Sequence, residues 1–109
     1  MGILIPAVEA RLKANILIVG GLPPYFGRAR PEVEFINFVS RVKIPTLMLN
    51  GRYDIIVPPE SGAEPIYDLL GTPEKDKKLI FYDGAHFIPR NELIRETLDW
   101  LDRYLGPPK

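Results

Sequence analysis

The sequence holds 109 residues, a length that allows one domain with a modest core and excludes a two-domain organisation. Its 14 Lys and Arg residues are interleaved with 14 Asp and Glu residues, so it lacks the basic excess by which nucleic-acid-binding proteins are recognised. It contains no Cys, which excludes disulfides, thiolate chemistry and Cys-ligated zinc.

The first predicted strand spans Asn15 to Gly20, a continuous apolar run closed by glycine. A loop with Gly-Gly and Pro-Pro pairs follows from Gly21 to Arg30 and lacks the spacing of a dinucleotide-binding fingerprint. In a parallel sheet this loop would lie at the edge where ligands bind. The segment from Pro31 to Val42 repeats apolar residues mostly every three or four positions, which predicts a short amphipathic helix.

The second predicted strand spans Thr46 to Asn50. Like the first strand it is continuously apolar rather than alternating, which is typical of strands covered on both faces. A helix is predicted from Ser61 to Leu70, with Gly71 as its C-cap. The charges from Glu74 to Lys78 alternate in sign and predict a solvated turn, and the third predicted strand follows from Lys78 to Tyr82.

The last predicted helix spans Asn91 to Leu105 and ends at Gly106. Its apolar residues form a helical stripe that we assign to the core, namely Leu93, Ile94, Thr97, Leu98, Trp100, Leu101, Tyr104 and Leu105. Strands that alternate with helices are typical of an α/β fold in which right-handed crossovers join parallel strands. We therefore predict one domain over residues 1–109, with a three-stranded parallel sheet flanked by helices.

Turns with titratable side chains follow the second and third predicted strands. Asp54 lies in the first turn and His86 in the second. Adjacent parallel strands lie about 5 Å apart and end at the same sheet edge, so the two side chains can meet there. Taken alone, Asp54 is explained as a turn former and His86 as a loop histidine without a task. Their joint placement favours a histidine held by a carboxylate, the acid and base of a nucleophilic triad.

A nucleophile for this pair is missing from the sequence. Such folds place the nucleophile before the acid and the base, on a sharp strand-to-helix turn. The two serines are Ser40, on a predicted helix, and Ser61, after the acid turn, and neither lies in a Gly-x-Ser-x-Gly elbow. Arg52 and Tyr53 border the acid and are candidates for substrate contacts, although an exposed arginine and a half-buried tyrosine need no such role.

Three segments together carry a family resemblance. They are the strand from Val42 to Gly51 running into Tyr53-Asp54, the turn Gly84-Ala85-His86-Phe87, and the closing helix from Leu98 to Leu105. With these segments the chain resembles the C-terminal part of the dienelactone-hydrolase and prolyl-oligopeptidase-like α/β-hydrolases. The resemblance implies a serine hydrolase of esterase or peptidase type, with Asp54 as the acid, His86 as the base and no cofactor.

The N-terminal residues also resemble a particular place in that family. Gly2 to Ala14 is similar to the helix after the nucleophile elbow, and Asn15 to Gly20 to the sixth strand. The resemblance implies that the sequence begins just after the missing serine and lacks the first five strands and the oxyanion-hole donors. Loss of a serine nucleophile costs about six orders of magnitude in turnover, so we expect a C-terminal fragment that is inactive alone.

A function of another class remains open, a non-catalytic interaction or assembly module derived from the hydrolase fold. Either function leaves the edge at Asn15 to Gly20 unpaired, because in the whole fold the sixth strand pairs with the fifth. Apolar edge strands of this kind associate. We therefore expect a homodimer in which two such edges pair antiparallel into a six-stranded sheet.

His86 is the only histidine, and no His-rich or EF-hand-like spacing is present, so we expect no metal site. The longest apolar run, Ile16 to Val19, is far shorter than the ~20 residues of a membrane span. Met1 to Pro6 lacks the basic region and the long apolar region of a signal peptide. We expect a cytoplasmic protein without membrane or nucleic-acid partners.

Overall fold

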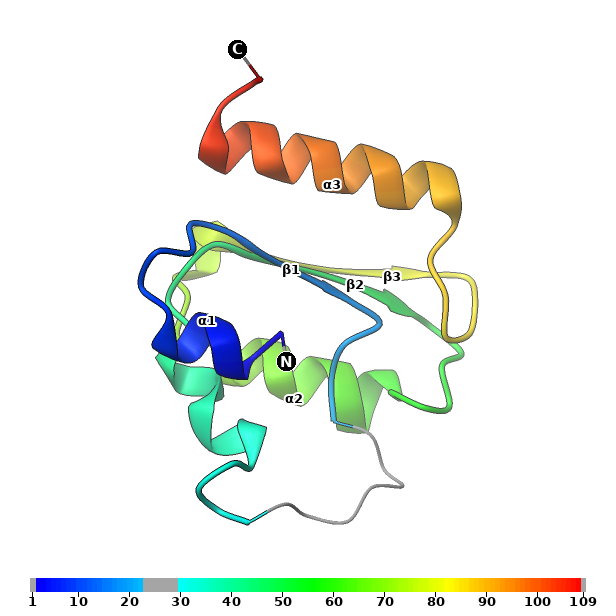
Figure 1. Ribbon diagram of the computed structural model, residues 1–109. Coiled ribbons are helices and arrows are strands. Elements are labelled where there is room, and N and C mark those ends of the chain that lie inside the picture. The colour runs from blue at the N-terminus through cyan, green and yellow to red at the C-terminus, as the bar shows by residue number, and fades with distance from the viewer. Residues whose placement is uncertain (1, 23–29, 109) are drawn as a thin grey trace.

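The computed structural model describes residues 2–22 and 30–108, and its elements are labelled in Figure 1. One sheet has the order β1-β2-β3, formed by β1 (Asn15–Ile18), β2 (Thr46–Gly51) and β3 (Lys77–Tyr82). Both pairings are parallel, with Ile16 beside Leu47 and Met48 beside Leu79. The predicted three-stranded parallel sheet is confirmed.

The strand β1 ends earlier than the predicted strand from Asn15 to Gly20. Val19 has a φ of 47°, a left-handed conformation that β-branched residues rarely adopt, so the chain leaves the sheet direction after Ile18. The Val19 amide still donates to the Leu49 carbonyl oxygen at 2.8 Å. The residue that follows β1 is therefore still hydrogen-bonded to β2.

Helices lie on both faces of the sheet. In Figure 1, α3 lies above the sheet, and α1 and α2 lie below it. The helix η1 is a 3-10 helix that contacts α1 and α2 on that lower face, and η2 is a π-helical turn that leads into α2. The bounds are α1 (Leu4–Val8), η1 (Phe35–Arg41), η2 (Pro59–Ala63), α2 (Glu64–Leu69), the 3-10 turn η3 (Glu74–Asp76) and α3 (Arg90–Leu105).

Two of the predicted helices are shorter or of another kind. The segment from Gly2 to Ala14 is helical only in α1, and after Glu9 the chain turns toward β1. The segment from Pro31 to Val42 begins with a turn and forms a 3-10 helix, not the α-helix that its apolar spacing predicts. Such spacing does not separate the two helix types when the helix is short.

The helix predicted from Ser61 to Leu70 begins in η2 and ends at Leu69, and its expected cap is wrong. Gly71 does not have the positive φ of a glycine C-cap, since Leu70 already leaves the helix with extended backbone. A side chain on Gly71 would instead overlap the Ser40 carbonyl oxygen of η1. The glycine is needed for this close approach and not for a cap.

The core is centred on β2, whose six residues are all buried. Met48 faces the layer of α1, η1 and α2, whereas Leu47 and Leu49 face α3 and pack near Trp100. Complete burial of a side chain of this size contributes about 1.5–3 kcal/mol, so β2 is the main source of hydrophobic stabilisation. Its continuous apolar sequence is explained by coverage on both faces.

The prediction that the whole apolar stripe of α3 lies in the core is wrong. Trp100 is the buried residue of the helix, whereas Ile94, Leu98 and Leu105 are 47%, 55% and 56% exposed. A three-stranded sheet is too narrow to cover the full width of the stripe. Ile94 and Leu98 instead line an open apolar hollow beside Ile18 of β1.

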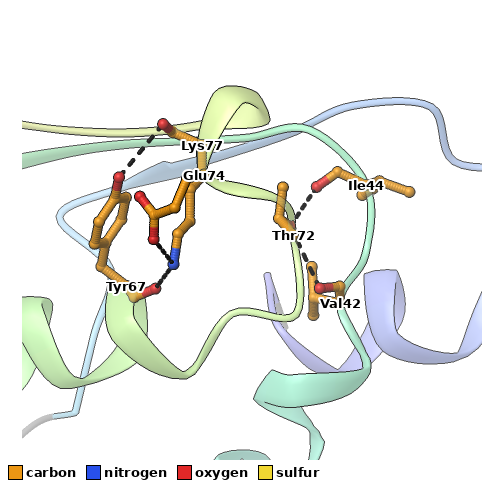
Figure 2. Close-up of polar contacts among 6 residues, drawn as sticks. All are labelled: Val42, Ile44, Tyr67, Thr72, Glu74 and Lys77. Atoms are coloured by element: carbon orange, nitrogen blue, oxygen red, sulfur yellow. Dashed lines mark hydrogen bonds and ion pairs between the residues drawn. The ribbon is translucent and has the colours of Figure 1, made fainter.

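A cluster of polar contacts fixes the edge where β2 and β3 begin, as Figure 2 shows. The side chain of Lys77 is 4% exposed, and its ammonium group donates to the Tyr67 carbonyl oxygen at 2.8 Å. It also lies 3.2 Å from a Glu74 carboxylate oxygen and 4.4 Å from the centre of the Tyr67 ring. Nearby, the Thr72 hydroxyl donates to the Ile44 carbonyl oxygen at 2.7 Å. The prediction of a solvated turn from Glu74 to Lys78 is therefore wrong at Lys77.

In the described part of the chain, no helix has both the length and the apolar character needed to cross a membrane.

Candidate functional site

The turns that follow β2 and β3 lie side by side because backbone hydrogen bonds continue the parallel ladder beyond the strands. The Arg52 amide donates to the Tyr82 carbonyl oxygen at 2.8 Å, and the Tyr53 amide donates to the Gly84 carbonyl oxygen at 2.9 Å. These bonds need no particular side chain at either position. The spacing between the two turns is therefore set by the main chain.

Gly51 allows the two turns to approach each other. A Cβ atom at this position would overlap the carbonyl oxygen of Ala85, the residue that precedes His86. Main-chain atoms cannot swing aside as the end of a long side chain does, so any larger residue at position 51 must push the second turn away. Gly51 thereby positions His86 relative to the end of β2.

The structure brings the two predicted site residues into contact. The Nδ1 atom of His86 lies 2.7 Å from the Oδ2 atom of Asp54, within hydrogen-bonding distance. The Asp54 side chain is fully buried, whereas 38% of the His86 side chain is exposed. The carboxylate thus holds the histidine from the interior, and part of the histidine side chain stays exposed to solvent.

The second carboxylate oxygen of Asp54 is bound to the main chain of its own turn. Oδ1 accepts hydrogen bonds from the amides of Ile56 at 2.8 Å and Val57 at 2.9 Å. Burial acts to raise the pKa of Asp54, but the bonds from Val57 and Ile56 and the contact with His86 outweigh it, and the pKa lies below its ordinary value. The carboxylate is therefore kept ionised and fixed in orientation.

This arrangement can hold a base ready for proton transfer. A carboxylate at Nδ1 favours the tautomer that carries its hydrogen on that nitrogen, and this leaves the Nε2 lone pair of His86 to accept a proton. The positive charge that would form on the ring lies beside the ionised Asp54. The geometry is that of the acid and base in a nucleophilic triad.

The residues next to Asp54 and His86 in sequence form an exposed rim that contains charged, aromatic and aliphatic side chains. Arg52 forms an ion pair with Asp83 at 3.5 Å, and both side chains are largely exposed. Tyr53 is 66% exposed, more than the half-buried tyrosine that we expected. Ile55 and Phe87, which directly follow the acid and the base in sequence, are also exposed. Within the described residues, no hydrogen bond or ion pair joins the side chain of Arg52 or Tyr53 to His86.

The two serines lie on other elements than Asp54 and His86. Ser40 is an exposed residue of η1, and Ser61 is an exposed residue of η2. Within residues 2–22 and 30–108, the hydrogen-bond partner of the His86 side chain is Asp54. The loop from Gly21 to Arg30, which we expected at the ligand-binding edge, lies outside the described residues at positions 23–29.

The sequence alone does not identify two residues that position the end of β2. The sequence places Gly51 at the end of a predicted strand, whereas its positioning role depends on a distance to Ala85 that no local pattern reveals. Asn50 is fully buried, and its side-chain amide donates to the Gly20 carbonyl oxygen at 3.0 Å, which ties the end of β2 to the end of β1. A buried asparagine at the end of an apolar strand is a signal that could have indicated this role.

The side chains of the described segments offer no group of three or more His, Asp or Glu residues placed to hold a metal ion. The pair of Asp54 and His86 is explained by the hydrogen bonds given above.

Comparison with known proteins finds one matching family and several similar solved structures. The model of a family described as PET hydrolase-like matches residues 30–107. A cold-adapted esterase from an Arctic intertidal metagenomic library is 29% identical, with a TM-score of 0.72 over 95% of this chain and 44% of the esterase chain. A monoacylglycerol lipase from Paleococcus ferrophilus is 34% identical, with a TM-score of 0.50 over 59% of this chain and 26% of the lipase chain.

The fold recurs in a more distant protein. The esterase Pf2001 from Pyrococcus furiosus has a TM-score of 0.67 at 16% identity, over 96% of this chain and 49% of the esterase chain. No curated protein sequence matches the chain. The chain thus spans less than half the length of the esterases that it resembles.

Proposed function

The chain belongs to the PET hydrolase-like family, and we propose that it supplies the acid and the base of a serine hydrolase that cleaves esters. In this proposal Asp54 is the acid and His86 is the base. The observation that carries it is the 2.7 Å contact between the buried carboxylate and His86 Nδ1. The similarity to an Arctic esterase over 95% of this chain supports an ester substrate.

The reaction assigns a distinct task to each residue. His86 Nε2 takes the proton of a nucleophilic hydroxyl as that oxygen attacks the ester carbonyl, and Asp54 stabilises the imidazolium that forms. The imidazolium then donates this proton to the departing alkoxide, which leaves as the alcohol. Water attacks the acyl-enzyme with His86 again as the base, and the acid product and the free hydroxyl are restored.

We place the nucleophile outside these 109 residues. Ser40 and Ser61 lie on exposed helical turns, and neither sits on a strand-to-helix elbow. The chain corresponds to 44% of the Arctic esterase, so a fold of that kind has room for further strands and for oxyanion-hole donors. In this proposal the chain is a C-terminal portion of a serine hydrolase and is inactive by itself.

The first test is hydrolysis of p-nitrophenyl acetate by the purified chain beside His86→Ala, together with labelling by a fluorophosphonate probe. We expect equal background rates and no labelled serine. Labelling together with activity that His86→Ala abolishes would contradict the external nucleophile. It would identify Ser40 or Ser61 as the third member of the triad.

A second test examines the roles of Asp54 and His86 in a complete fold. The segment of the Arctic esterase that corresponds to this chain is replaced by the chain itself, and circular dichroism verifies that the chimera is folded. We expect esterase activity that falls about 10⁴-fold or more in the His86→Ala chimera. A folded and active chimera that His86→Ala leaves unchanged would refute the assignment of the base.

The second candidate function is a non-catalytic interaction module derived from the hydrolase fold. The observation that favours it is the apolar hollow beside β1, which is lined by Ile18, Ile94 and Leu98 among others. A folded chimera without activity, combined with saturable binding of a partner by the chain, would favour this function over catalysis.

A further inference from the structure

The turn that carries the base has few main-chain bonds of its own. No main-chain hydrogen bond joins residues 85–88 to another described residue. On the N-terminal side of this stretch, the Gly84 carbonyl oxygen accepts a hydrogen bond from the Tyr53 amide at 2.9 Å. On the C-terminal side, the Pro89 carbonyl oxygen accepts one from the Leu93 amide at 2.9 Å, at the start of α3. Between these two points, the position of the turn depends on its side chains.

Ile88 is the buried side chain of this stretch, whereas residues 85–87 are exposed. It lies in one apolar cluster with Leu47 and Leu49 of β2 and Trp100 of α3. To move the turn outward, the Ile88 side chain must leave the cluster and expose apolar surface to water, which costs free energy. Ile88 therefore anchors the turn on the face of the sheet that α3 covers.

The turn that carries the acid is anchored on the opposite face. The Val57 amide donates to Asp54 Oδ1 at 2.9 Å, and the Val57 side chain is buried in the cluster that contains Met48. This cluster lies on the face covered by α1, η1 and α2, below the sheet in Figure 1. The hydrogen bond between Asp54 and His86 thus joins two turns whose apolar anchors, Val57 and Ile88, lie in different layers.

We propose that Ile88 is a positioning residue for the base, and that its place in the α3 layer holds His86 Nδ1 within reach of Asp54. His86 lies two residues from the bonded Gly84 and two residues from Ile88, and two residues span at most about 7 Å. The ring is therefore confined as long as both neighbours stay fixed. The catalytic consequence of this inference rests on the proposed function, whereas the position of His86 can be measured in the chain itself.

Three variants separate this role from a general loss of packing. Ile88→Ala removes most of the anchor, and an outward shift of about 1 Å is enough to break a hydrogen bond of 2.7 Å. Ile88→Val retains most of the apolar side chain and should preserve the bond. Leu47→Ala is the matched control, because Leu47 is buried in the same cluster but lies four residues before Gly51, about 13 Å along β2 from the turns.

Proton NMR of the folded chain is the first measurement. The downfield signal of the Nδ1 hydrogen of His86 reports the bond to Asp54, and it should be lost in Ile88→Ala and retained in Ile88→Val and Leu47→Ala. Urea unfolding compares the stability of the variants, and we expect Leu47→Ala to lose at least as much stability as Ile88→Ala, because Leu47 is fully buried. The NMR signal and the stability should therefore change independently.

The pKa of Asp54, measured from its carboxyl carbon by NMR, is the second measurement. Burial acts to raise this pKa, and the Val57 bond, the His86 contact and the Ile56 bond lower it. Losing the His86 contact alone should therefore raise the pKa in Ile88→Ala and leave it unchanged in Leu47→Ala.

Two results would overturn the proposal. One is a folded Ile88→Ala chain that keeps both the Nδ1 signal and the low pKa of Asp54. The other is a Leu47→Ala chain that loses both, because any defect in the cluster would then have the same effect. If Ile88→Ala does not fold, Ile88→Thr replaces it, since it has the shape of Ile88→Val but places a hydroxyl in the apolar cluster. Equal signals in the Thr and Val variants would then contradict the anchor.

The chimera with the Arctic esterase tests the catalytic consequence. Ile88→Ala should lower kcat about 10²-fold, as expected for a base displaced by about 1 Å, while KM changes little, and Ile88→Val should restore kcat. An unchanged kcat in Ile88→Ala would refute this consequence. A folded chimera that is insensitive to His86→Ala would instead refute the proposed function, and the NMR comparison in the chain would still decide the role of Ile88.

Discussion

Asp54 Oδ2 and His86 Nδ1 lie 2.7 Å apart although the two residues come from turns after different strands. The contact is made from the inside of the molecule, because the Asp54 side chain is fully buried and the His86 ring is partly exposed. The two residues are therefore coupled to the stability of the fold as well as to the proposed chemistry.

Asp54→Asn should lower the stability of the chain in a pH-dependent way. Folding lowers the pKa of Asp54 below its ordinary value of 3.8, so the ionised carboxylate stabilises the folded state above that pH. This stabilisation is lost as the pH falls from about 4 toward the lower pKa of the folded state. Urea unfolding should show a loss of about 1–3 kcal/mol at pH 7 and a smaller loss at pH 3. The exposed Asp83→Asn serves as the control.

Gly51→Ala should separate the acid from the base. The added methyl group overlaps the Ala85 carbonyl oxygen, so the His86 turn must move away from β2. In proton NMR of the wild type we expect a downfield signal from the Nδ1 hydrogen of His86, and this signal should disappear in the variant. Gly84→Ala is the control, because the atoms nearest to its methyl group belong to the ring of Phe87, at 3.2 Å and beyond. An unchanged signal in Gly51→Ala would show that the turn tolerates the methyl group.

Lys77→Met should destabilise the fold without affecting the site. The substitution removes the charged donor at 2.8 Å from the Tyr67 carbonyl oxygen and leaves it only the longer bond from the Leu70 amide at 3.3 Å, for which we expect a cost of about 1–3 kcal/mol. Glu74→Gln should cost less than about 1 kcal/mol, because the Glu74 side chain is 81% exposed and its ion pair is screened. Thermal and urea unfolding compare the two variants, and equal losses would contradict this assignment.

Trp100→Ala and Leu105→Ala should differ strongly in their effect on stability. Trp100 is 5% exposed and lies 4.8 Å from the Tyr104 ring between centroids, so its removal should cost about 3–5 kcal/mol. Leu105 belongs to the same apolar stripe but is 56% exposed, and its removal should cost less than about 1 kcal/mol. Similar losses in urea unfolding would mean that the stripe is more deeply packed than its exposure indicates.

The sheet and the meeting of Asp54 with His86 could be predicted because their signals are local. Continuous apolar runs indicated the strands, and the parallel order brings the carboxyl ends of neighbouring strands to one edge. The contact at 2.7 Å agrees with that expectation, whereas the catalytic role of the two residues stays a prediction.

The misjudged features depend on contacts between distant segments. The periodicity of the last helix identifies its apolar face but not the width of the sheet beneath it, so the exposure of Ile94 and Leu98 was not foreseen. Lys77 follows acidic neighbours like a surface residue, and its burial results from packing against Tyr67 of α2. The role of Gly51 depends on the position of Ala85 in space.

The main-chain bonds from Arg52 to Tyr82 and from Tyr53 to Gly84 have a consequence for sequence variation. Since amide and carbonyl groups hold the two turns together, the side chains at positions 52 and 53 can be exchanged without loosening the link. Both side chains point mainly to solvent at the rim of the pair. The contact between Asp54 and His86 can therefore be kept while the exposed residues around it change. Under the proposed function, substrate choice would then vary without a change in the geometry of proton transfer.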